Sequence, residues 1–513
     1  MNRIFSLLLI LFFSVSLFGQ KDLDRKLKEL DAYYEQALAD WNVPGMAVAI
    51  VKDGEIVFSK GYGTLNINTG EPVDGNSLFA IASNTKAFTA TALAMLADEG
   101  KLSWNDRVRD YLPWFELYDP YVSDNFTIRD LLTHRSGLKT FSGDLIWYGT
   151  NLGREEVVRN ARYLEPTFGF RSGYGYSNIM YIAAGLVIEK VTGENWDDFI
   201  RERILDPLHM DRTLSSTEAI PGMDNVSSPH NDVKDSIITI EWLNWDNVAP
   251  AGAIISSVND ISKWLIFNMN RGITADGDTL LSAGRFDEMW AAVNPQGVSS
   301  WSMQQWPSTH FKAYGLGWAM FDYHGRKVLG HGGGYDGFIS NTTFVPEDEL
   351  GMVFLTNKNT SLYYPLKFKT LDVMLDAGLD TDWSKDFLTM MEQRNEYSEK
   401  AKAKAEEERV KDSRPTLPIE DYLGTYNCKM YGDARVYFEG TQLMVHLLPT
   451  EIFVGTLDHW QYNTWKIEMK DVPALPPGLV NFIIDQEGKV VEMKIDIPNP
   501  DFYFDELKFL KIR

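Results

Sequence analysis

Residues 78–93 read LFAIASNTKAFTATAL, and within this stretch Ser83 and Lys86 have the spacing of a nucleophile and its base. Apolar side chains follow at helical spacing as far as Gly100, which predicts a helix that begins near Ser83. One helical turn brings positions i and i+3 onto the same face, so the Lys86 amine can reach the Ser83 hydroxyl. The helix N-terminus also offers backbone N–H groups to a developing oxyanion. The stretch therefore contains a candidate catalytic serine at the start of a helix.

A second Ser-x-x-Lys pair, Ser136 and Lys139 in THRSGLK, competes with the first. Gly137 and the preceding LLTHR are typical of a helix end that enters a turn, so we interpret this pair as structural. A chain of 513 residues contains about two such pairs by chance. The catalytic interpretation of Ser83 therefore needs support from other parts of the chain.

Two polar motifs further along the chain give this support. Tyr176 and Asn178 precede an apolar helical run; a phenol can exchange protons, and an amide can bind a substrate amide or carbonyl. His331 precedes three glycines at a predicted strand. Glycines on a strand edge let a substrate backbone approach closely and leave N–H groups free. Taken singly, the first motif is also typical of an aromatic loop packed on a helix, and the second of a flexible turn.

The order Ser-x-x-Lys, Tyr-x-Asn and glycine-rich strand resembles the signature of the serine β-lactamase and penicillin-binding protein superfamily. The stretches IRDLLTHRSGL, IRERILDPLHMDRT and GHGGGYDGFISNTTFVPEDELGMVFLTN are similar to the class C branch, the β-lactamase-related serine hydrolases. The likeness extends over residues 30–375. It implies an α+β fold, an α/β sandwich in which helices flank an antiparallel sheet that carries a helical insertion.

The resemblance implies a role for each motif. Ser83 falls on the nucleophile, Lys86 on its proton-accepting partner, and Tyr176 on the tyrosine that shares the general-base role and protonates the leaving group. The backbone N–H groups of Ser83 and Gly334 fall on the oxyanion hole. Either a desolvated neutral lysine or a tyrosine stabilised by a lysine charge can take the serine proton, so the identity of the base stays open. The residues expected to contact substrate are Asn178, His331, Gly333 and Gly334.

One departure from the family pattern concerns the strand motif. Penicillin-recognising members of the family carry a lysine at this position. This chain has His331 there, and in this it is similar to the esterase and D-aminopeptidase branches. A lysine ammonium holds a substrate carboxylate, whereas histidine is mostly neutral above about pH 6.5. We therefore expect poor hydrolysis of β-lactams, with a protonated His331 replacing the lysine only below about pH 6. Three residues are candidates to wall the cleft: Asp144, Trp147 and Tyr148.

Strand signals stand at both ends of this region. Residues 46–63, MAVAIVKDGEIVFSKGYG, predict a hairpin, and residues 324–357 contain three further strand-like runs, so we expect one antiparallel sheet built from both ends. A charged, helix-forming segment follows, and the short strand-like runs after it predict a small all-β barrel or sandwich. This part is similar to the lipocalin-like domain appended to such hydrolases, which implies a barrel. The predicted parts are a signal peptide (1–20), a hydrolase domain (21–380), a charged helical linker (381–415) and a β-barrel-like C-terminal domain (416–513).

Composition narrows the classes of partner and compartment. The apolar segment 4–18 is shorter than the roughly 20 residues that span a bilayer, so it predicts a cleaved signal peptide, a periplasmic or secreted protein and no stable membrane insertion. The only cysteine, Cys428, cannot form an internal disulfide. A net charge of -23 disfavours nucleic acid as a partner. The eight histidines lack ligand spacing, so we expect neither a metal nor an organic cofactor.

The sequence as a whole predicts an exported serine hydrolase that cleaves an amide, peptide or ester through an acyl-enzyme on Ser83. Its expected partner is a small-molecule or peptide substrate. One alternative is a penicillin-binding, DD-carboxypeptidase-like protein of the cell wall, which His331 disfavours. The other is a non-catalytic ligand-binding module, which the intact set of Ser83, Lys86 and Tyr176 disfavours.

Overall fold

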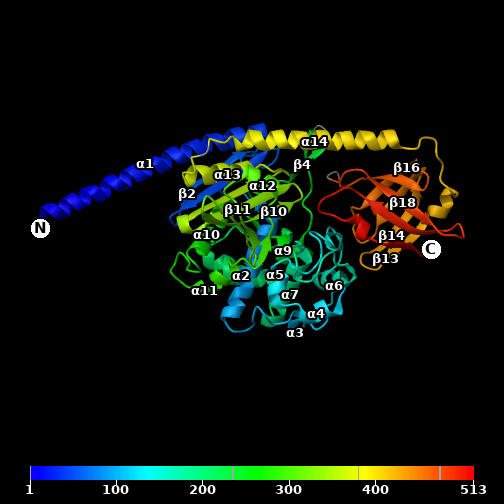
Figure 1. Cartoon of the computed structure of the whole chain (residues 1–513), viewed down its shortest axis with the longest axis horizontal. Coiled ribbons are helices and arrows are strands. Elements are labelled where there is room, and N and C mark those ends of the chain that lie inside the picture. The colour runs from blue at the N-terminus through cyan, green and yellow to red at the C-terminus, as the bar shows by residue number, and fades with distance from the viewer. Residues whose placement is uncertain (1, 234–235, 379, 473–474, 513) are drawn as a thin grey trace.

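An antiparallel sheet of eight strands forms the centre of the larger part of the molecule (Figure 1). The computed structural model describes residues 2–233, 236–378, 380–472 and 475–512. The sheet has the order β2-β1-β12-β11-β10-β9-β8-β7, and every pairing in it is antiparallel. This confirms the predicted α+β fold class, with a sheet built from both ends of its region. The strands are β1 Gly45–Lys52, β2 Glu55–Gly63, β7 Asn294–Gln296, β8 Lys312–Tyr314, β9 Ala319–Tyr323, β10 Arg326–Tyr335, β11 Phe338–Val345 and β12 Leu350–Thr356.

Strand β1 shows why helices cover both faces of the sheet. Every residue of β1 except the last is buried, and successive side chains of a strand point to opposite faces. Its larger side chains pack against α1 (Asn2–Asp40) and α13 (Tyr363–Met374), whereas its alanines pack in the cluster that contains α2 (Thr85–Asp98). A strand that is apolar on both faces needs cover on both. The larger side chains are Met46, Val48 and Ile50, and the alanines are Ala47 and Ala49.

The chain between β2 and β7 forms a helical insertion, which lies below the sheet in Figure 1. Helix α2 is central to it and packs against α7 (Asn178–Thr192) and α9 (Ala249–Gly252). Its residues from Thr85 to Ala97 are all buried, as expected of a helix that is apolar around its circumference. The other helices of this part of the chain are α3 Val108–Tyr111, α4 Pro120–Asn125, α5 Ile128–Leu132, α6 Arg154–Asn160, α8 Trp196–Ile200, α10 Val258–Met269 and α11 Ala283–Met289, and α12 Ser300–Gln305 lies between β7 and β8. Two further strand pairs are β3 Phe79–Ala80 with β6 Ile255–Ser256, and β4 His230–Val233 with β5 Ser236–Thr239.

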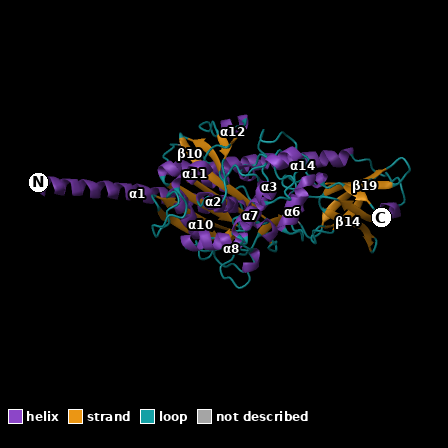
Figure 2. Ribbon diagram, turned by 90° about the horizontal axis from the view of Figure 1, so that it is seen from below, coloured by secondary structure: helices purple, strands orange, loops and turns teal. Residues whose placement is uncertain are grey.

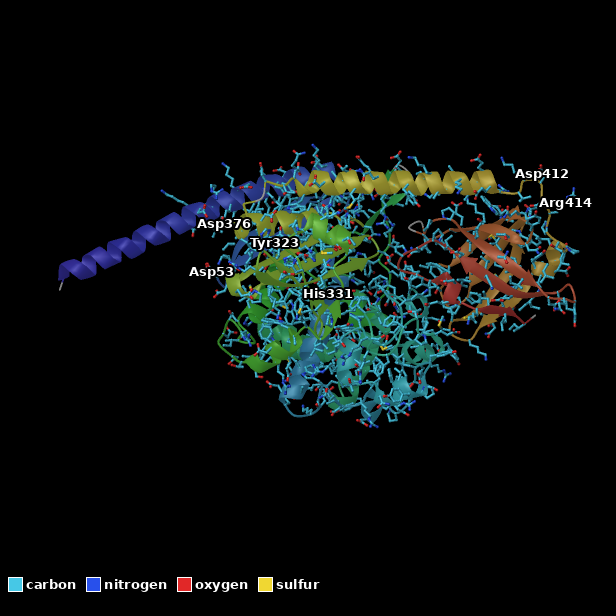
Figure 3. All side chains as sticks on the ribbon, viewed as in Figure 1. Asp53, Tyr323, His331, Asp376, Asp412 and Arg414 are labelled. Atoms are coloured by element: carbon cyan, nitrogen blue, oxygen red, sulfur yellow. The ribbon has the colours of Figure 1, made fainter. Side chains whose placement is uncertain are left out.

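Helix α14 (Trp383–Glu408) leads from the sheet to a second, all-β part of the chain. Trp383 and Phe387 pack its first turns into the core, and its charged second half is exposed, as are Asp412 and Arg414 after it (Figure 3). Beyond it, eight strands close into a barrel because β20 pairs with both β13 and β19. This confirms the predicted barrel. Its strands are β13 Gly424–Cys428, β14 Gly432–Glu439, β15 Gln442–Leu447, β16 Val454–Gln461, β17 Thr464–Met469, β18 Gly478–Ile484, β19 Val490–Asp496 and β20 Phe509–Lys511.

The barrel packs against the helical insertion, on the side of α6 (Figure 2). Glu506 of the barrel accepts hydrogen bonds from Ser142 Oγ at 2.7 Å and from Gly143 N at 2.8 Å. The ring of Phe502 packs on Tyr148, with the ring centroids 4.3 Å apart. The barrel therefore contacts the loop that the sequence analysis predicted to wall the cleft.

The second Ser-x-x-Lys pair contributes to this contact. The Lys139 amine lies 3.4 Å from the centre of the Tyr503 ring, in the barrel. Ser136 is buried, and its Oγ accepts a hydrogen bond from Leu138 N at 3.3 Å. The two side chains therefore serve separate packing contacts, which agrees with the structural interpretation of this pair.

The first half of α1, which contains the apolar segment 4–18, projects away from the rest of the molecule (Figure 1). Among the described residues, no helix combines the length and the apolar character that crossing a membrane requires. Within the same ranges, no group of three histidine, cysteine, aspartate or glutamate side chains is arranged to hold a metal ion.

Candidate active site

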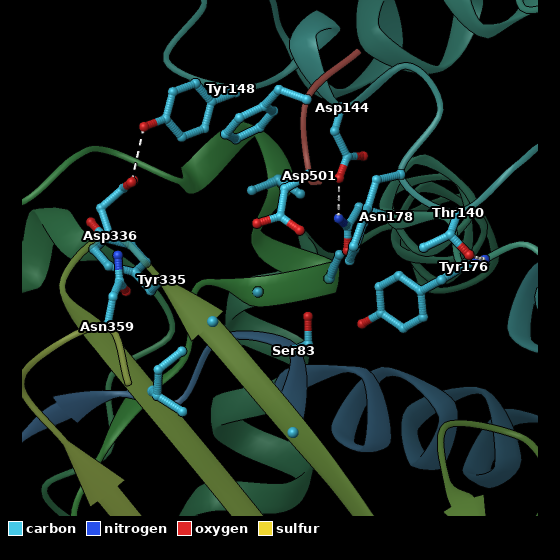
Figure 4. A pocket seen from close by; sticks show the side chains of 18 of the residues that line it. Ser83, Thr140, Asp144, Tyr148, Tyr176, Asn178, Tyr335, Asp336, Asn359 and Asp501 are labelled. Atoms are coloured by element: carbon cyan, nitrogen blue, oxygen red, sulfur yellow. Dashed lines mark hydrogen bonds between the residues drawn. The ribbon is translucent and has the colours of Figure 1, made fainter. Parts of the chain in front are cut away.

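Ser83 lies in a single 3-10 turn, Ala82–Asn84, which connects strand β3 to helix α2. The helix predicted to begin near Ser83 begins two residues later, at Thr85. The Ser83 side chain is partly exposed, whereas those of its neighbours in the turn are buried. Figure 4 shows the Ser83 hydroxyl at the floor of a cleft.

Hydrogen bonds from the main sheet hold this turn in a strained conformation. Ala82 has a φ of 47°, in the left-handed region that costs an L-residue about 1–2 kcal/mol. The Ile81 carbonyl accepts hydrogen bonds from Asn84 Nδ2 at 3.2 Å and from Ser340 Oγ, on strand β11, at 2.6 Å. Asn84 Nδ2 also donates to Ser340 Oγ at 2.8 Å. Such contacts over-determine a strained backbone, and they fix the position of Ser83 relative to the sheet.

Lys86 is fully buried beneath Ser83. Its Nζ lies 3.0 Å from Ser83 Oγ, 2.6 Å from Asn178 Oδ1 and 2.8 Å from the carbonyl oxygen of Ala251. The amide and carbonyl oxygens can only accept, so Lys86 donates to both. Burial lowers the pKa of Lys86 well below its usual value, against the opposing effect of the Asp144 carboxylate. A neutral lysine amine has two protons and one lone pair. Because Lys86 donates both protons to these acceptors, its lone pair can accept the proton of the Ser83 hydroxyl.

Tyr176 faces Ser83 from the side of the helical insertion. The Tyr176 hydroxyl is directed toward Ser83 (Figure 4), and Lys86 Nζ lies 4.7 Å from the centre of the Tyr176 ring. Burial raises the pKa of the Tyr176 phenol well above its usual value, although the hydrogen bond with Ser83 opposes this shift. The phenol therefore keeps its proton at neutral pH, which makes Lys86 the better proton acceptor of the two.

Asn178 is held on both sides of its amide group. Its Oδ1 accepts from Lys86, and its Nδ2 donates to Asp144 Oδ2 at 2.7 Å (Figure 4). Asp144 also accepts from Trp147 Nε1 at 2.9 Å, and burial raises its pKa to about 7. Because an amide nitrogen carries two protons, Asn178 retains a second N–H for a substrate carbonyl.

The glycines at the end of β10 bring this strand against the serine turn. A Cβ at position 333 would lie 2.2 Å from the Ile81 carbonyl oxygen and 3.0 Å from Ser83 N, so this approach requires glycine. Gly333 thus faces the turn, whereas Gly334 lines the cleft together with Ser83. Strand β9 pairs with β10 only over the first half of β10. The free second half is an edge along which a substrate backbone can align.

His331 is buried within the sheet domain (Figure 3). Its Nδ1 lies 2.6 Å from the Gly332 carbonyl oxygen, which only accepts, so Nδ1 carries the proton and Nε2 accepts from Tyr314 Oη at 2.9 Å. Burial, with a smaller effect of the nearby Lys86 amine when it is protonated, lowers the pKa of His331 to about 3. The expectation that His331 becomes cationic below about pH 6 is therefore wrong, because the sequence does not show the burial of the ring.

The cleft above Ser83 has a volume of 720 Å³. The helical insertion, the end of the sheet and the barrel all contribute to its walls. Asp144, Trp147 and Tyr148 line it, as the sequence analysis expected. Asn178 and His331, two of the expected substrate contacts, also reach its surface.

The further lining residues that escaped the sequence analysis include Asp336 next to β10, and Asp501 and Phe502 from the barrel. Figure 4 shows the Asp501 carboxylate directed into the cleft. Asp336 accepts from Tyr148 Oη at 2.9 Å, and burial raises its pKa to about 6. Its position two residues after the glycine motif was a usable signal. No signal marks Asp501, because its place in the cleft exists only once the barrel has docked.

A family model described as Beta-lactamase matches residues 30–368, more than half of the chain. This chain belongs to the β-lactamase family. The match confirms the resemblance drawn from the three motifs. A second family model, a domain of unknown function (DUF3471), matches residues 408–511 and covers the barrel. The protein is therefore a β-lactamase-family serine hydrolase with a C-terminal barrel of the DUF3471 family.

Curated relatives of this β-lactamase-family hydrolase include both hydrolases and a penicillin-binding protein. Unguisins hydrolase ungD' of Aspergillus campestris is 33% identical over 415 residues, which are 76% of this chain and 74% of that protein. Unguisins hydrolase ungD of Aspergillus violaceofuscus is 29% identical over 455 residues, with coverage of 83% and 80%. Penicillin-binding protein 4 of Amycolatopsis lactamdurans is 28% identical over 338 residues, with coverage of 63% and 83%.

Solved structures share the fold of this hydrolase. The octameric penicillin-binding protein homologue from Pyrococcus abyssi aligns with 94% of this chain and 100% of its own, with a TM-score of 0.61 and 20% identity. The crystal structure of SurE aligns with 96% of this chain and 100% of its own, with a TM-score of 0.54 and 19% identity. At these identities the likeness extends to the fold alone.

The close approach at Gly333 leads to a prediction. Gly333→Ala should slow covalent labelling of the protein by a fluorophosphonate probe about a hundredfold, since the new methyl group displaces the Ser83 turn and one oxyanion donor with it. Gly332→Ala is the matched control, because a Cβ there has nothing nearer than the Tyr363 hydroxyl at 3.7 Å. Labelling rates of the two variants, with thermal melts to check folding, measure the difference. Equal rates for both would contradict the role given to Gly333.

Proposed function

We propose that this β-lactamase-family protein is an exported serine hydrolase that cleaves an amide, peptide or ester bond through an acyl-enzyme on Ser83. One observation carries the proposal: the buried Lys86 amine lies 3.0 Å from Ser83 Oγ while two fixed acceptors hold its protons. The names of the two unguisins hydrolases support a hydrolytic activity. The apolar segment 4–18 supports export to the periplasm or out of the cell.

In the proposed acylation, Lys86 takes the hydroxyl proton of Ser83 as Oγ attacks the substrate carbonyl carbon. The N–H groups of Ser83 and Gly334 stabilise the oxyanion of the tetrahedral intermediate. Tyr176 donates its phenol proton to the leaving nitrogen or oxygen as that bond breaks, and the proton on Lys86 then restores the phenol. Water attacks the acyl-enzyme in the same manner and releases a carboxylic acid and free Ser83. The cycle uses neither a metal ion nor an organic cofactor.

The charges around Ser83 support a substrate that carries an amine rather than a carboxylate. Three carboxylates line the cleft, those of Asp144, Asp336 and Asp501. Among the residues that the structure describes, the cleft lining contains no lysine and no arginine. His331 is neutral and supplies no cation. We expect Asp501, which forms no ion pair with any described residue, to receive the ammonium group of an aminoacyl amide or ester.

Two other functions have weaker support. A penicillin-binding or DD-carboxypeptidase-like protein is the second candidate, because penicillin-binding protein 4 is a relative. Such a protein holds a substrate carboxylate, for which the described cleft lining offers no lysine or arginine. A non-catalytic ligand-binding module would not need a desolvated lysine beneath an accessible serine, and burying that amine is costly.

The first test of the proposal is acylation of Ser83. A fluorophosphonate probe should label the protein and map to the peptide that contains Ser83, whereas a fluorescent penicillin should label it poorly. Ser83→Ala should abolish labelling, and Lys86→Met and Tyr176→Phe should each slow it at least about a hundredfold. Ser136→Ala, in the other Ser-x-x-Lys pair, is the control and should label normally. Rapid labelling by the penicillin would favour the second candidate, and an adduct on Ser136 would exclude the assignment of Ser83.

The second test is the pH dependence of kcat/KM for a p-nitrophenyl ester. The proposed base is neutral Lys86, so activity falls as pH decreases through the pKa of this amine. The Asp144 carboxylate favours the protonated amine and raises that pKa. Asp144→Asn removes this charge and should move the acid limb of the profile to lower pH by about one unit. A limb that stays in place, or moves to higher pH, contradicts Lys86 as the base.

The third test concerns the amine of the substrate. Asp501→Asn should raise KM about tenfold for an aminoacyl p-nitroanilide or ester, because a charge-assisted hydrogen bond is lost. The N-acetylated form of the same substrate has no ammonium group, and its KM should not change. Asp505→Asn is the matched control, since the Asp505 side chain lies nearby in the chain and is 67% exposed. Equal effects of Asp501→Asn on both substrates would contradict recognition of an amine.

A further inference from the structure

A second cavity lies on the other face of strand β10. It has a volume of 310 Å³ and extends between the sheet and helix α13. Gly333 faces the serine turn, whereas a Cβ on the adjacent Gly332 would point toward the Tyr363 hydroxyl of α13, 3.7 Å away. Gly332 and His331 line both cavities. The strand that contributes Gly334 to the cleft is therefore also a wall of this second space.

Two lysines line the second cavity, and its described lining contains no aspartate or glutamate. Lys367, on α13, is only 8% exposed, and Lys312, on β8, is half-buried. Neither forms an ion pair with any residue that the structure describes; Lys312 reaches only Ser302 Oγ, at 3.4 Å. Burial, together with the smaller effect of the Lys312 charge, lowers the pKa of Lys367 to about 7. A buried, unpaired amine of this kind is costly and marks a candidate binding site.

The surroundings of Lys367 are aromatic. Its Nζ lies 4.8 Å from the ring centre of Phe368, 5.1 Å from that of Tyr364 and 5.4 Å from that of Phe321. Such rings stabilise an ammonium group through their faces but offer it no anionic oxygen. Lys367 Nζ forms no hydrogen bond with any residue that the structure describes. The remainder of the lining is also largely apolar and includes Trp306.

We propose that this cavity binds a small carboxylic acid with an apolar body, its carboxylate held between Lys367 and Lys312 and its body against Trp306, Phe321 and Tyr364. The volume is at the lower end of the range of small-molecule pockets, about 300–1,000 Å³, which restricts the ligand to a compact aromatic or aliphatic acid. The inference stands on the cavity and its charges, and it is independent of the activity proposed for Ser83.

The test uses 3-phenylpropionate as the probe and the full chain with the substitution Ser83→Ala, so that binding does not involve acylation. Isothermal titration at about pH 6, below the pKa of Lys367, should show saturable binding at one site. Lys367→Met keeps the length of the side chain, removes its charge and should weaken binding at least about tenfold. The neutral amide 3-phenylpropionamide should bind the unmodified cavity at least about tenfold more weakly than the acid.

Lys369→Met is the matched control, since Lys369 lies on the same helix and pairs with Glu29 at 2.8 Å. It should bind the acid as the original chain does. Thermal melts show whether each variant folds, and Lys312→Met replaces Lys367→Met if the latter does not. Any one of three results would overturn the proposal. The first is no saturable binding of the acid, the second is equal affinity for the acid and its amide, and the third is equal affinity of the Lys367→Met or Lys312→Met variant and the original chain.

Discussion

The burial of a lysine amine beneath an accessible serine is the constraint on which the rest of the site depends. In water the Lys86 amine would stay protonated at neutral pH and could not accept a proton. Removing it from water requires fixed partners, and these are Ser83, Asn178 and the carbonyl of Ala251. They belong to segments that are far apart in the chain. The packing of α2 against α7 and α9 is therefore both the core of the helical insertion and the means by which Lys86 becomes a possible base.

A second constraint joins this insertion to the sheet. Ser83 sits on a strained turn that Ser340, on strand β11, holds by a hydrogen bond to the Ile81 carbonyl. The adjacent strand, β10, approaches the same turn closely enough that position 333 cannot carry a Cβ. The serine, the lysine and the strand edge thus have fixed relative positions before any substrate binds. Preorganisation of this kind stabilises charge in a transition state without further rearrangement.

Strand β10 also separates two environments of opposite charge. On the side of Ser83, three carboxylates line the cleft, and one of them, Asp501, comes from the C-terminal barrel. On the side of α13, Lys367 and Lys312 line a smaller cavity that has no carboxylate among its described residues. The barrel is therefore part of the cleft wall, which gives a physical reason for its attachment to the hydrolase domain. Because the two cavities meet at His331 and Gly332, a ligand in either one contacts the same strand.

The sequence by itself determined the features that depend on neighbouring residues. The helix after Ser83, the hairpin of β1 and β2, the antiparallel sheet and the barrel all follow from local periodicity and turn residues, which act within a few positions of the chain. The three motifs also identified the residues that the fold assembles around Ser83. Only the tertiary structure decided the low pKa of His331, the approach made possible by Gly333, the place of Asp501 and the isolation of Lys367. Each of these depends on burial and on partners from distant segments, which a linear pattern does not contain.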